Sequence, residues 1–401
     1  MPALAIPTRQ ILLSFRAAIA PAGAEPPETD EEKSKETFRG SLSAIEFADG
    51  GRTLFLGGDE TVEASPSLER LVQEQGARFG GQISQRVDAF LDLPSNTVKK
   101  GRVQEIDIEG LAFEGETLWM VGSHSLKRSK PKLSKNLAKN LDRLATVEAE
   151  GNRFFLASIP VGKDGLGRSV LPANKLNKPL PARLADEEGE SILMNALRKD
   201  RHLGPFLQSW SNPVNGEPTI LGIPSKDNGF DIEGLAVDGD RLFLGLRGPV
   251  IGKYAIVLEI AVTAGAEAGE LKLRLVTDTS YYIKHFVNLR GLGIRDLCKD
   301  GDDLLLLAGP TMALDGPSSI FRWSGILATS SKGDSLTDET SGLLERRLDL
   351  PCGEGCDHPE GMALLPRQQG QPREIVIVYD SPGPLRRVGA TDVWADVFLL
   401  T

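Results

Sequence analysis

A short motif that returns at long intervals constrains the fold of this chain more than any other feature. "DIEGLAF" begins at Asp107, "DIEGLAV" at Asp231, and a weaker form, "HPEGMAL", at His358. Two more segments, from Ser41 and from Asn288, share the same order: a short strand, a turn rich in Gly and acidic residues, and a strongly apolar strand. Because Gly, Asp and Asn adopt the positive φ angles of tight turns, each segment predicts a β-hairpin.

The second strand of each hairpin is apolar on both of its faces. It reads "TLWMV", "RLFLGL", "DLLLLA" and "EIVIV" in four of the segments, which indicates burial on both sides. Further strand-like runs follow, such as "NRFFLASIPV" after the second hairpin and "KYAIVLEIAV" after the third. Repeated units of four strands predict an all-β fold, a β-propeller with four-stranded antiparallel blades, formed by residues 1–401 as one domain.

The number of blades depends on the long interval between Asp107 and Asp231. This interval holds two stretches with apolar residues at helical spacing, near residues 133–150 and 188–200. We interpret both as helical insertions and favour five blades, with six as the alternative. An N-terminal strand at residues 11–16 is expected to pair with the C-terminal blade. This pairing would close the ring and remove two free sheet edges.

The first strand of a propeller blade lines the central channel, so its polar residues gather at the channel mouth. At the position of Asp107 the segments supply Ser41, Asp107, Asp231, Asn288 and His358. Two residues further, where strand alternation returns to the same side, they supply Ser43, Glu109, Glu233, Arg290 and Glu360. The ends of the second strands add Asp59, His124, Arg247, Asp380 and, more loosely, Thr311. We therefore expect the functional site at the top of the channel.

Acidic residues dominate these positions, and their chemistry suggests a metal ion. Converging carboxylates repel one another, raise one another's pKa, or bind a cation. The expected metal ligands are Asp107, Glu109, Asp231, Glu233 and Glu360. Oxygen ligands suit calcium, which takes roughly 6–8 of them. The alternative is that the acids solvate a wet channel or accept hydrogen bonds from the main chain of a neighbouring blade.

The other polar residues of the channel mouth are candidates for catalysis. His124 or Asp380 would act as general base on water, and His358 lies on the same face. Arg247 and Arg290 would hold an anionic group and stabilise developing negative charge. Together they predict a metal-assisted hydrolase of a phosphoester or related ester. The alternatives are a non-catalytic propeller that binds a small molecule or a protein, and glycoside chemistry, which needs two carboxylates roughly 5–9.5 Å apart.

Charge and hydropathy narrow the expected partners. The net charge of −10 argues against nucleic-acid binding. No apolar run reaches the roughly 18 residues that span a membrane, so we expect no membrane partner. The segment from Lys127 to Arg143 is locally basic and predicts attraction of an anionic small molecule, or else a solvated helix face. The three cysteines favour a cytoplasmic location, with a periplasmic or secreted one as the alternative.

Several of these motifs resemble a known family. "FDIEGLA" twice, "GSHS", "RGLGI" and "PEGMAL" followed by "YDSP" resemble the bacterial family called domain of unknown function 3616, over nearly the whole chain. This resemblance implies a propeller and no known activity. "EGLA" is also similar to an element of phytase-like esterase and calcium-dependent nucleotidase propellers, which implies channel acids that bind calcium. Here Arg290 and Ser43 stand where that pattern has Glu.

Overall fold

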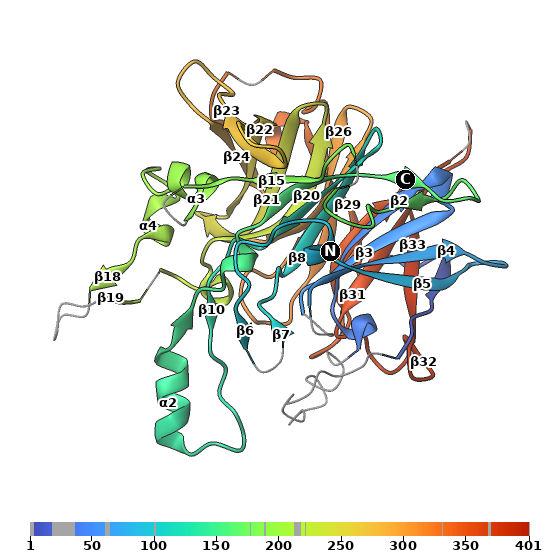
Figure 1. Ribbon diagram of the computed structural model, residues 1–401, viewed down its shortest axis with the longest axis horizontal. Helices are drawn as coiled ribbons and strands as arrows, with labels where there is room; N and C mark the ends of the chain where they lie inside the picture. Colours follow the sequence, from blue (N-terminus) through green and yellow to red (C-terminus); the bar gives the residue numbers. More distant parts are fainter. Residues whose placement is uncertain are drawn as a thin grey trace.

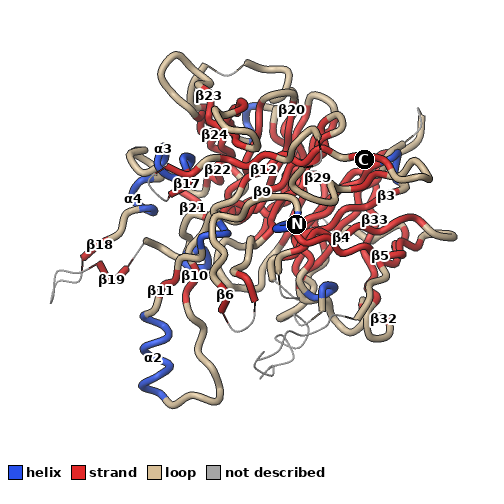
Figure 2. Tube along the Cα trace, viewed as in Figure 1, coloured by secondary structure: helices blue, strands red, loops and turns tan. Residues whose placement is uncertain are grey.

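The structure is a computed structural model that describes residues 4–17, 37–60, 65–99, 102–176, 178–187, 190–211, 218–220, 222–330, 332–367 and 370–400. Strands make up most of the body, and helices lie outside it (Figures 1 and 2). The fold is an all-β propeller, as the sequence predicted. Among the described residues, no helix is long and apolar enough to cross a membrane.

The described strands form five antiparallel units, numbered 1 to 5 along the chain. Within each unit the strands are given from the innermost outwards. Unit 1 contains β2 (Leu42–Ala48), β3 (Thr53–Gly58), β4 (Ser67–Gln73) and β5 (Arg78–Arg86). Unit 2 contains β8 (Ile108–Glu114), β9 (Thr117–Gly122), β12 (Leu156–Pro160) and β15 (Ala182–Leu184). Unit 3 contains β20 (Asp231–Asp238), β21 (Arg241–Ile251) and β22 (Tyr254–Ala264). Two further strands, β23 (Glu270–Arg274) and β24 (Tyr282–Asn288), both pair with β22.

Units 4 and 5 complete the ring. Unit 4 contains β25 (Gly293–Asp300), β26 (Asp303–Gly309), β27 (Ser318–Trp323) and β29 (Leu344–Leu350). Unit 5 contains β30 (His358–Leu364), β31 (Arg373–Asp380), β33 (Asp392–Leu400) and the N-terminal β1 (Arg9–Leu13), which pairs with β33. The innermost strands contact one another in the closed order β2, β8, β20, β25, β30 and back to β2. They therefore surround a common axis.

Short elements decorate this ring. Two-stranded pairs are β6 (Val98–Lys99) with β7 (Arg102–Val103), β10 (Lys127–Arg128) with β11 (Val147–Glu148), β13 (Gly162–Lys163) with β14 (Ser169–Val170), β16 (Asp186–Glu187) with β17 (Glu190–Ser191), and β18 (Trp210–Ser211) with β19 (Pro218–Ile220). β28 (Ser335–Thr337) pairs with β24, and β32 (Arg387–Val388) with β33. The 3-10 turns are Phe38–Gly40, Asp49–Gly51, Val87–Ala89, Gly151–Arg153, Ser225–Asp227 and Glu339–Ser341.

The α-helices of the described chain lie in the long interval between β9 and β20, where the sequence predicted two helical insertions. Helix α2 (Leu137–Ala145) lies within residues 133–150. Helix α3 (Ile192–Leu197) lies within residues 188–200, of which 188–189 are outside the described residues, and α4 (Gly204–Leu207) follows it. The described strands of this long interval either extend unit 2 or form two-stranded pairs.

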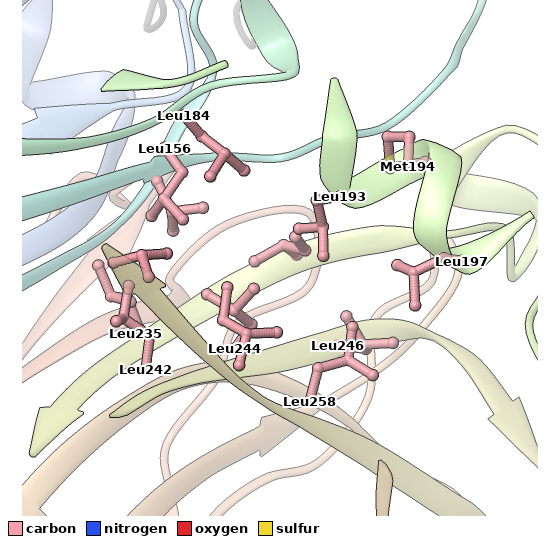
Figure 3. Close-up of a cluster of buried hydrophobic side chains, with 14 of the residues drawn as sticks. Leu156, Leu184, Leu193, Met194, Leu197, Leu235, Leu242, Leu244, Leu246 and Leu258 are labelled. Carbon is pink, nitrogen blue, oxygen red and sulfur yellow. The ribbon is translucent and has the colours of Figure 1, made fainter. Parts of the chain in front are cut away.

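Apolar side chains fill the space between neighbouring units. Leu156 and Leu184 of unit 2 pack with Leu235 and Leu244 of unit 3 in one buried cluster (Figure 3). The buried face of α3 covers this cluster, through Leu193, Met194 and Leu197. A second cluster joins units 1 and 2, and a third joins units 1 and 5. Burial on both faces explains why the second strands are apolar throughout.

Candidate functional site

A β-bulge interrupts the innermost strand of every unit at an equivalent place. In unit 2, Ile108 pairs with Gly122 and Gly110 with Val121, so Glu109 has no partner in the ladder. The bulged residues of units 1 to 5 are Ser43, Glu109, Glu233, Arg295 and Glu360. A bulge adds one residue to one strand and redirects its side chain, and bulges are common beside functional sites. The five bulges therefore define the ring of side chains at the channel.

The bulges correct the sequence alignment in unit 4. The sequence placed Asn288 and Arg290 in the two rings, but Asn288 ends β24 and Arg290 lies before β25. Arg290 forms a surface ion pair with Glu339, with the two side chains 52% and 42% exposed. Arg295 takes the ring position instead. "GIRDL" keeps the Ile and Leu spacing of "DIEGL", and this spacing was the signal that could have identified Arg295.

The residue that follows each bulge must be small or hydrogen-bonded. A Cβ at Gly110 would lie 2.7 Å from Cβ of Leu235 in the next unit, closer than real Cβ atoms approach. In unit 4 the equivalent residue is Asp296, whose Oδ2 accepts a hydrogen bond from the Met362 backbone N at 2.7 Å. Burial raises the pKa of Asp296 well above its usual value, although this hydrogen bond opposes the shift. Asp296 thus ties unit 4 to unit 5.

Arginines neutralise the acids on one side of the ring. Nε of Arg295 lies 2.9 Å from Oε2 of Glu233, and its Nη2 contacts Oε1 of Glu360. Nη1 of Arg247 lies 2.8 Å from Oε1 of Glu233 and 3.8 Å from Oδ2 of Asp231. Both oxygens of Glu233 are therefore bound by guanidinium groups. Arg247 is consequently a partner of the ring acids rather than a free anion-binding group.

Asp107 has an arginine partner that the sequence analysis missed. Nη1 of Arg153 lies 2.5 Å from Oδ2 of Asp107, and the same side chain pairs with Glu105 and Glu150 at 3.2 and 3.3 Å. Arg153 follows the α2 insertion and precedes β12, outside the repeated motif, so its contact with Asp107 could not be read from the sequence. Burial raises the pKa of Asp107 even though Arg153 lowers it.

Glu109 has no such partner. Its side chain is buried, with the residue 8% exposed, and no Lys, Arg or His of the described chain lies within ion-pairing distance of its carboxylate. Burial raises the pKa of Glu109 well above 4.5, and the negative charges of Asp107, Glu233 and Asp59 raise it further. Burial and the charge of Glu233 likewise raise the pKa of Asp231 well above its usual value. Glu109 is therefore the one ring glutamate without an ion pair among described residues, although the charges of Arg247 and Arg295 reach it.

The predicted histidines lie outside this group of carboxylates. His124 is buried, with Nδ1 2.9 Å from the Gly122 carbonyl oxygen and no hydrogen-bond partner for Nε2. Its ring packs edge-on against Phe154, and burial lowers its pKa to about 4. Among described residues, no carboxylate lies within ion-pairing distance of His124. His124 is therefore a neutral imidazole. It lies apart from the acids, whereas the sequence analysis expected a general base beside them.

His358 and Asp380 sit opposite each other at the start of β30 and the end of β31. Nε2 of His358 lies 3.1 Å from Oδ1 of Asp315. The two side chains are 35% and 41% exposed. Asp380 is buried, and its backbone also bridges to Ser41 of unit 1. Asp380 is thus buried next to the start of unit 1, whereas the His358 side chain is partly exposed.

The acids do not fit a calcium site in this arrangement. No group of three or more His, Cys, Asp or Glu side chains within the described ranges is placed to hold a metal ion. Glu233 and Glu360 already accept the guanidinium of Arg295, so only Glu109 of the three ring glutamates is without a cationic partner. A calcium ion bound by all three glutamates would have to displace Arg295 from Glu233 and Glu360. The positive charges of the ion and of Arg295 would also repel each other.

Solved structures share the broad outline of this chain at low similarity. PhoX from Pseudomonas fluorescens, in complex with vanadate, is 11% identical, with a TM-score of 0.37 and coverage of 99% of this chain and 97% of that chain. PQQ-bound aldose sugar dehydrogenase from Streptomyces coelicolor is 12% identical, with a TM-score of 0.36 and coverage of 98% and 99%. Hydrazine synthase from Kuenenia stuttgartiensis is 10% identical, with a TM-score of 0.30 and coverage of 94% and 66%, so this chain spans just under two thirds of it.

Sequence comparison gives a family but no characterised relative. No curated protein matches the chain. A family model described as "Protein of unknown function (DUF3616)" matches residues 41–396, which include the innermost strands of all five units. The chain therefore belongs to the DUF3616 family.

Proposed function

We propose that the acidic side of the channel mouth binds a small organic cation, such as an amine or a guanidinium compound. The observation that supports this proposal is the state of Glu109, which is buried among four other carboxylates and has no cationic partner. Its equivalents Glu233 and Glu360 are both paired with Arg295. An uncompensated buried acid destabilises a fold, and strongly shifted pKa values cluster at functional sites.

A hollow beside Asp107 marks the side from which a ligand would approach the acids. This shallow hollow of about 10 Å³, room for roughly one water molecule, lies between units 1 and 2, and its lining includes Phe38, Glu60, Pro66, Ile106 and Asp107. The lining combines apolar side chains with two carboxyl groups. This combination suits the end of an amine or guanidinium ligand that lies over the hollow, because such a ligand has an apolar part and several N–H donors.

Binding should be linked to proton release. Because the pKa of Glu109 is raised, its carboxyl group keeps its proton to a higher pH than an exposed glutamate does. A cation placed beside it would favour the charged form and lower that pKa. The proton would then leave when the cation binds, and the affinity should increase as the pH rises towards the pKa of the free site.

The sequence-based hydrolase remains a second candidate, supported by the same raised pKa. A carboxyl group whose pKa is raised keeps its proton to a higher pH and can act as a general acid, and ionised neighbours can orient water or charge. In this second candidate function, Glu109 would protonate the leaving group of an ester or phosphoester. Calcium assistance is not needed for that step, and the pairing of Glu233 and Glu360 with Arg295 weighs against it.

A thermal-shift screen tests the proposal. The full chain is scanned at pH 8 with monoamines, diamines, guanidines and quaternary ammonium ions, alongside calcium, magnesium and manganese. Glu109→Gln removes the titrating acid and keeps its shape. Glu46→Gln is the matched control, since Glu46 is another inner-strand acid and burial raises its pKa to about 8.

We expect at least one organic cation to raise the melting temperature of the wild type and of Glu46→Gln, but not of Glu109→Gln. If no organic cation does so, the proposal fails. A shift with calcium alone that Glu109→Gln abolishes would favour the metal site instead. Turnover of phosphoester or ester substrates that is lost in Glu109→Gln, without any cation effect, would favour the hydrolase.

A further inference from the structure

Helix α2 exposes its apolar face to solvent. Leu137, Leu141 and Leu144 follow one another at the i, i+4 and i+7 spacing of a single helix face, and they are 75%, 57% and 44% exposed. Leu133, just before the helix, is 84% exposed. No residue of α2 is buried. A helix with an apolar stripe normally packs that stripe against the body of its protein, so this stripe has no covering surface within the described chain.

The helix is held by polar contacts on the face next to the leucine stripe. The Asn136 side chain caps it by accepting a hydrogen bond from the Lys139 backbone N at 3.0 Å. Nδ2 of Asn140 donates to the carbonyl oxygens of Lys132 and Lys135 at 3.0 and 3.2 Å, and Nε of Arg143 donates to that of Lys130. The leucines are therefore not required to attach the helix to its own hairpin. They are preformed in a helix and available to a partner.

The same segment is strongly basic. We call residues 127–148 the α2 arm; they span β10, α2 and β11 and project away from the sheets (Figure 1). The arm contains seven Lys or Arg residues and two acids, a net charge of +5, whereas the net charge of −10 for the whole chain leaves −15 for the rest. Lys135 and Lys139 are exposed, and no carboxylate of the described chain pairs with them.

We propose that the α2 arm docks on an anionic phospholipid surface. A basic amphipathic helix with leucines on its opposite face lies in the membrane interface, with its apolar side chains in the acyl boundary and its cations at the headgroups. The sequence led us to expect no membrane partner, because it has no spanning segment. Surface docking needs no spanning segment, and it explains an exposed leucine stripe and a local positive charge together.

Charge and geometry favour lipid over a second copy of the chain. Pairing two α2 helices through their leucines would bring together two arms of +5 each. A nine-residue helix also offers far less than the roughly 1,000 Å² of a specific protein interface. The acidic body does not prevent docking, because the arm projects from it and exposed charges are screened beyond about 8 Å at physiological salt.

Co-sedimentation with vesicles tests this proposal on the full chain. One vesicle preparation contains phosphatidylcholine alone, and the other contains phosphatidylcholine with about one third phosphatidylglycerol. The double variant Leu137→Gln/Leu141→Gln removes the stripe, and Lys135→Gln/Lys139→Gln removes two free cations. Both act on exposed residues, so the fold should be unaffected. Leu385→Gln, at a leucine that is 96% exposed outside the arm, is the matched control.

We expect the wild type and Leu385→Gln to bind the anionic vesicles at least tenfold more strongly than the zwitterionic ones. The leucine variant should lose at least tenfold of this binding, and the lysine variant and high salt should weaken it. Equal binding by the wild type and the leucine variant would overturn the proposal, as would no binding to either vesicle. Self-association in light scattering that disappears in the leucine variant would assign the stripe to a second copy and also overturn it.

Discussion

Nε of Arg295 lies 2.9 Å from Oε2 of Glu233, and the two residues occupy the bulge positions of neighbouring units. The same guanidinium contacts Glu360, the bulged residue of the unit on its other side. One buried cation therefore joins three units of the propeller at the channel. This contact explains why two of the ring glutamates are neutralised while Glu109 is not.

Replacing Arg295 by Met should destabilise the protein by about 3–5 kcal/mol, because removing one partner of a buried ion pair leaves uncompensated charge. Chemical denaturation of the wild type and Arg295→Met measures this difference. Arg290→Met is the matched control, and loss of its exposed pair with Glu339 should change stability by no more than about 1 kcal/mol. Equal effects of the two substitutions would show that Arg295 does not hold the ring together.

Removal of Arg153 should also destabilise the protein, and more so at high pH. Arg153→Met leaves Asp107, Glu105 and Glu150 without this cation, so the pKa values of Asp107 and Glu105 should rise and their ionisation should oppose folding. We expect a loss of about 3 kcal/mol or more at pH 8 and a smaller loss at pH 5. Urea denaturation at the two pH values measures it. A loss that is the same at both would mean that the carboxylates do not sense Arg153.

Glu46 predicts a specific pH dependence. Burial raises its pKa to about 8 in the folded protein, above the usual value of 4.5. The folded state therefore binds more protons than the unfolded state between these values, so stability should fall as the pH rises from about 4.5 to 8. Glu46→Gln should remove part of that fall, with a gain on the order of a few kcal/mol at pH 8. Parallel pH profiles for the variant and the wild type would contradict the assignment.

Much of the fold could be predicted from the sequence, because it depends on local patterns that repeat. The Ile and Leu spacing around Asp107 and Asp231 marks the innermost strands, and the apolar strands that follow mark the cores between units. Both helical insertions also follow from apolar periodicity. Periodicity shows which face of α2 is apolar, but it cannot show whether another surface covers that face, and here none in the described chain does.

The site was harder to predict, because it depends on register and on distant partners. The "GLG" of residues 291–293 drew the alignment of unit 4 five residues too early, and the bulge that places Arg295 is a backbone feature without its own residue signature. Arg153 lies outside the repeat and meets Asp107 only in the folded chain. The acids of the ring were found from sequence, whereas the arginines that decide which of them are neutralised were mostly not.

The central claim is that Glu109 is an acid without an ion pair, and that its raised pKa falls when an organic cation binds. Carbon-13 NMR titration of glutamate carboxyl groups tests it most directly, with Glu109→Gln used to assign the signal. We predict that the free protein shows a Glu109 pKa well above 4.5, and that the cation identified by the thermal-shift screen lowers it. A Glu109 signal that titrates near 4.5 in the free protein, or that the cation does not move, would contradict the claim.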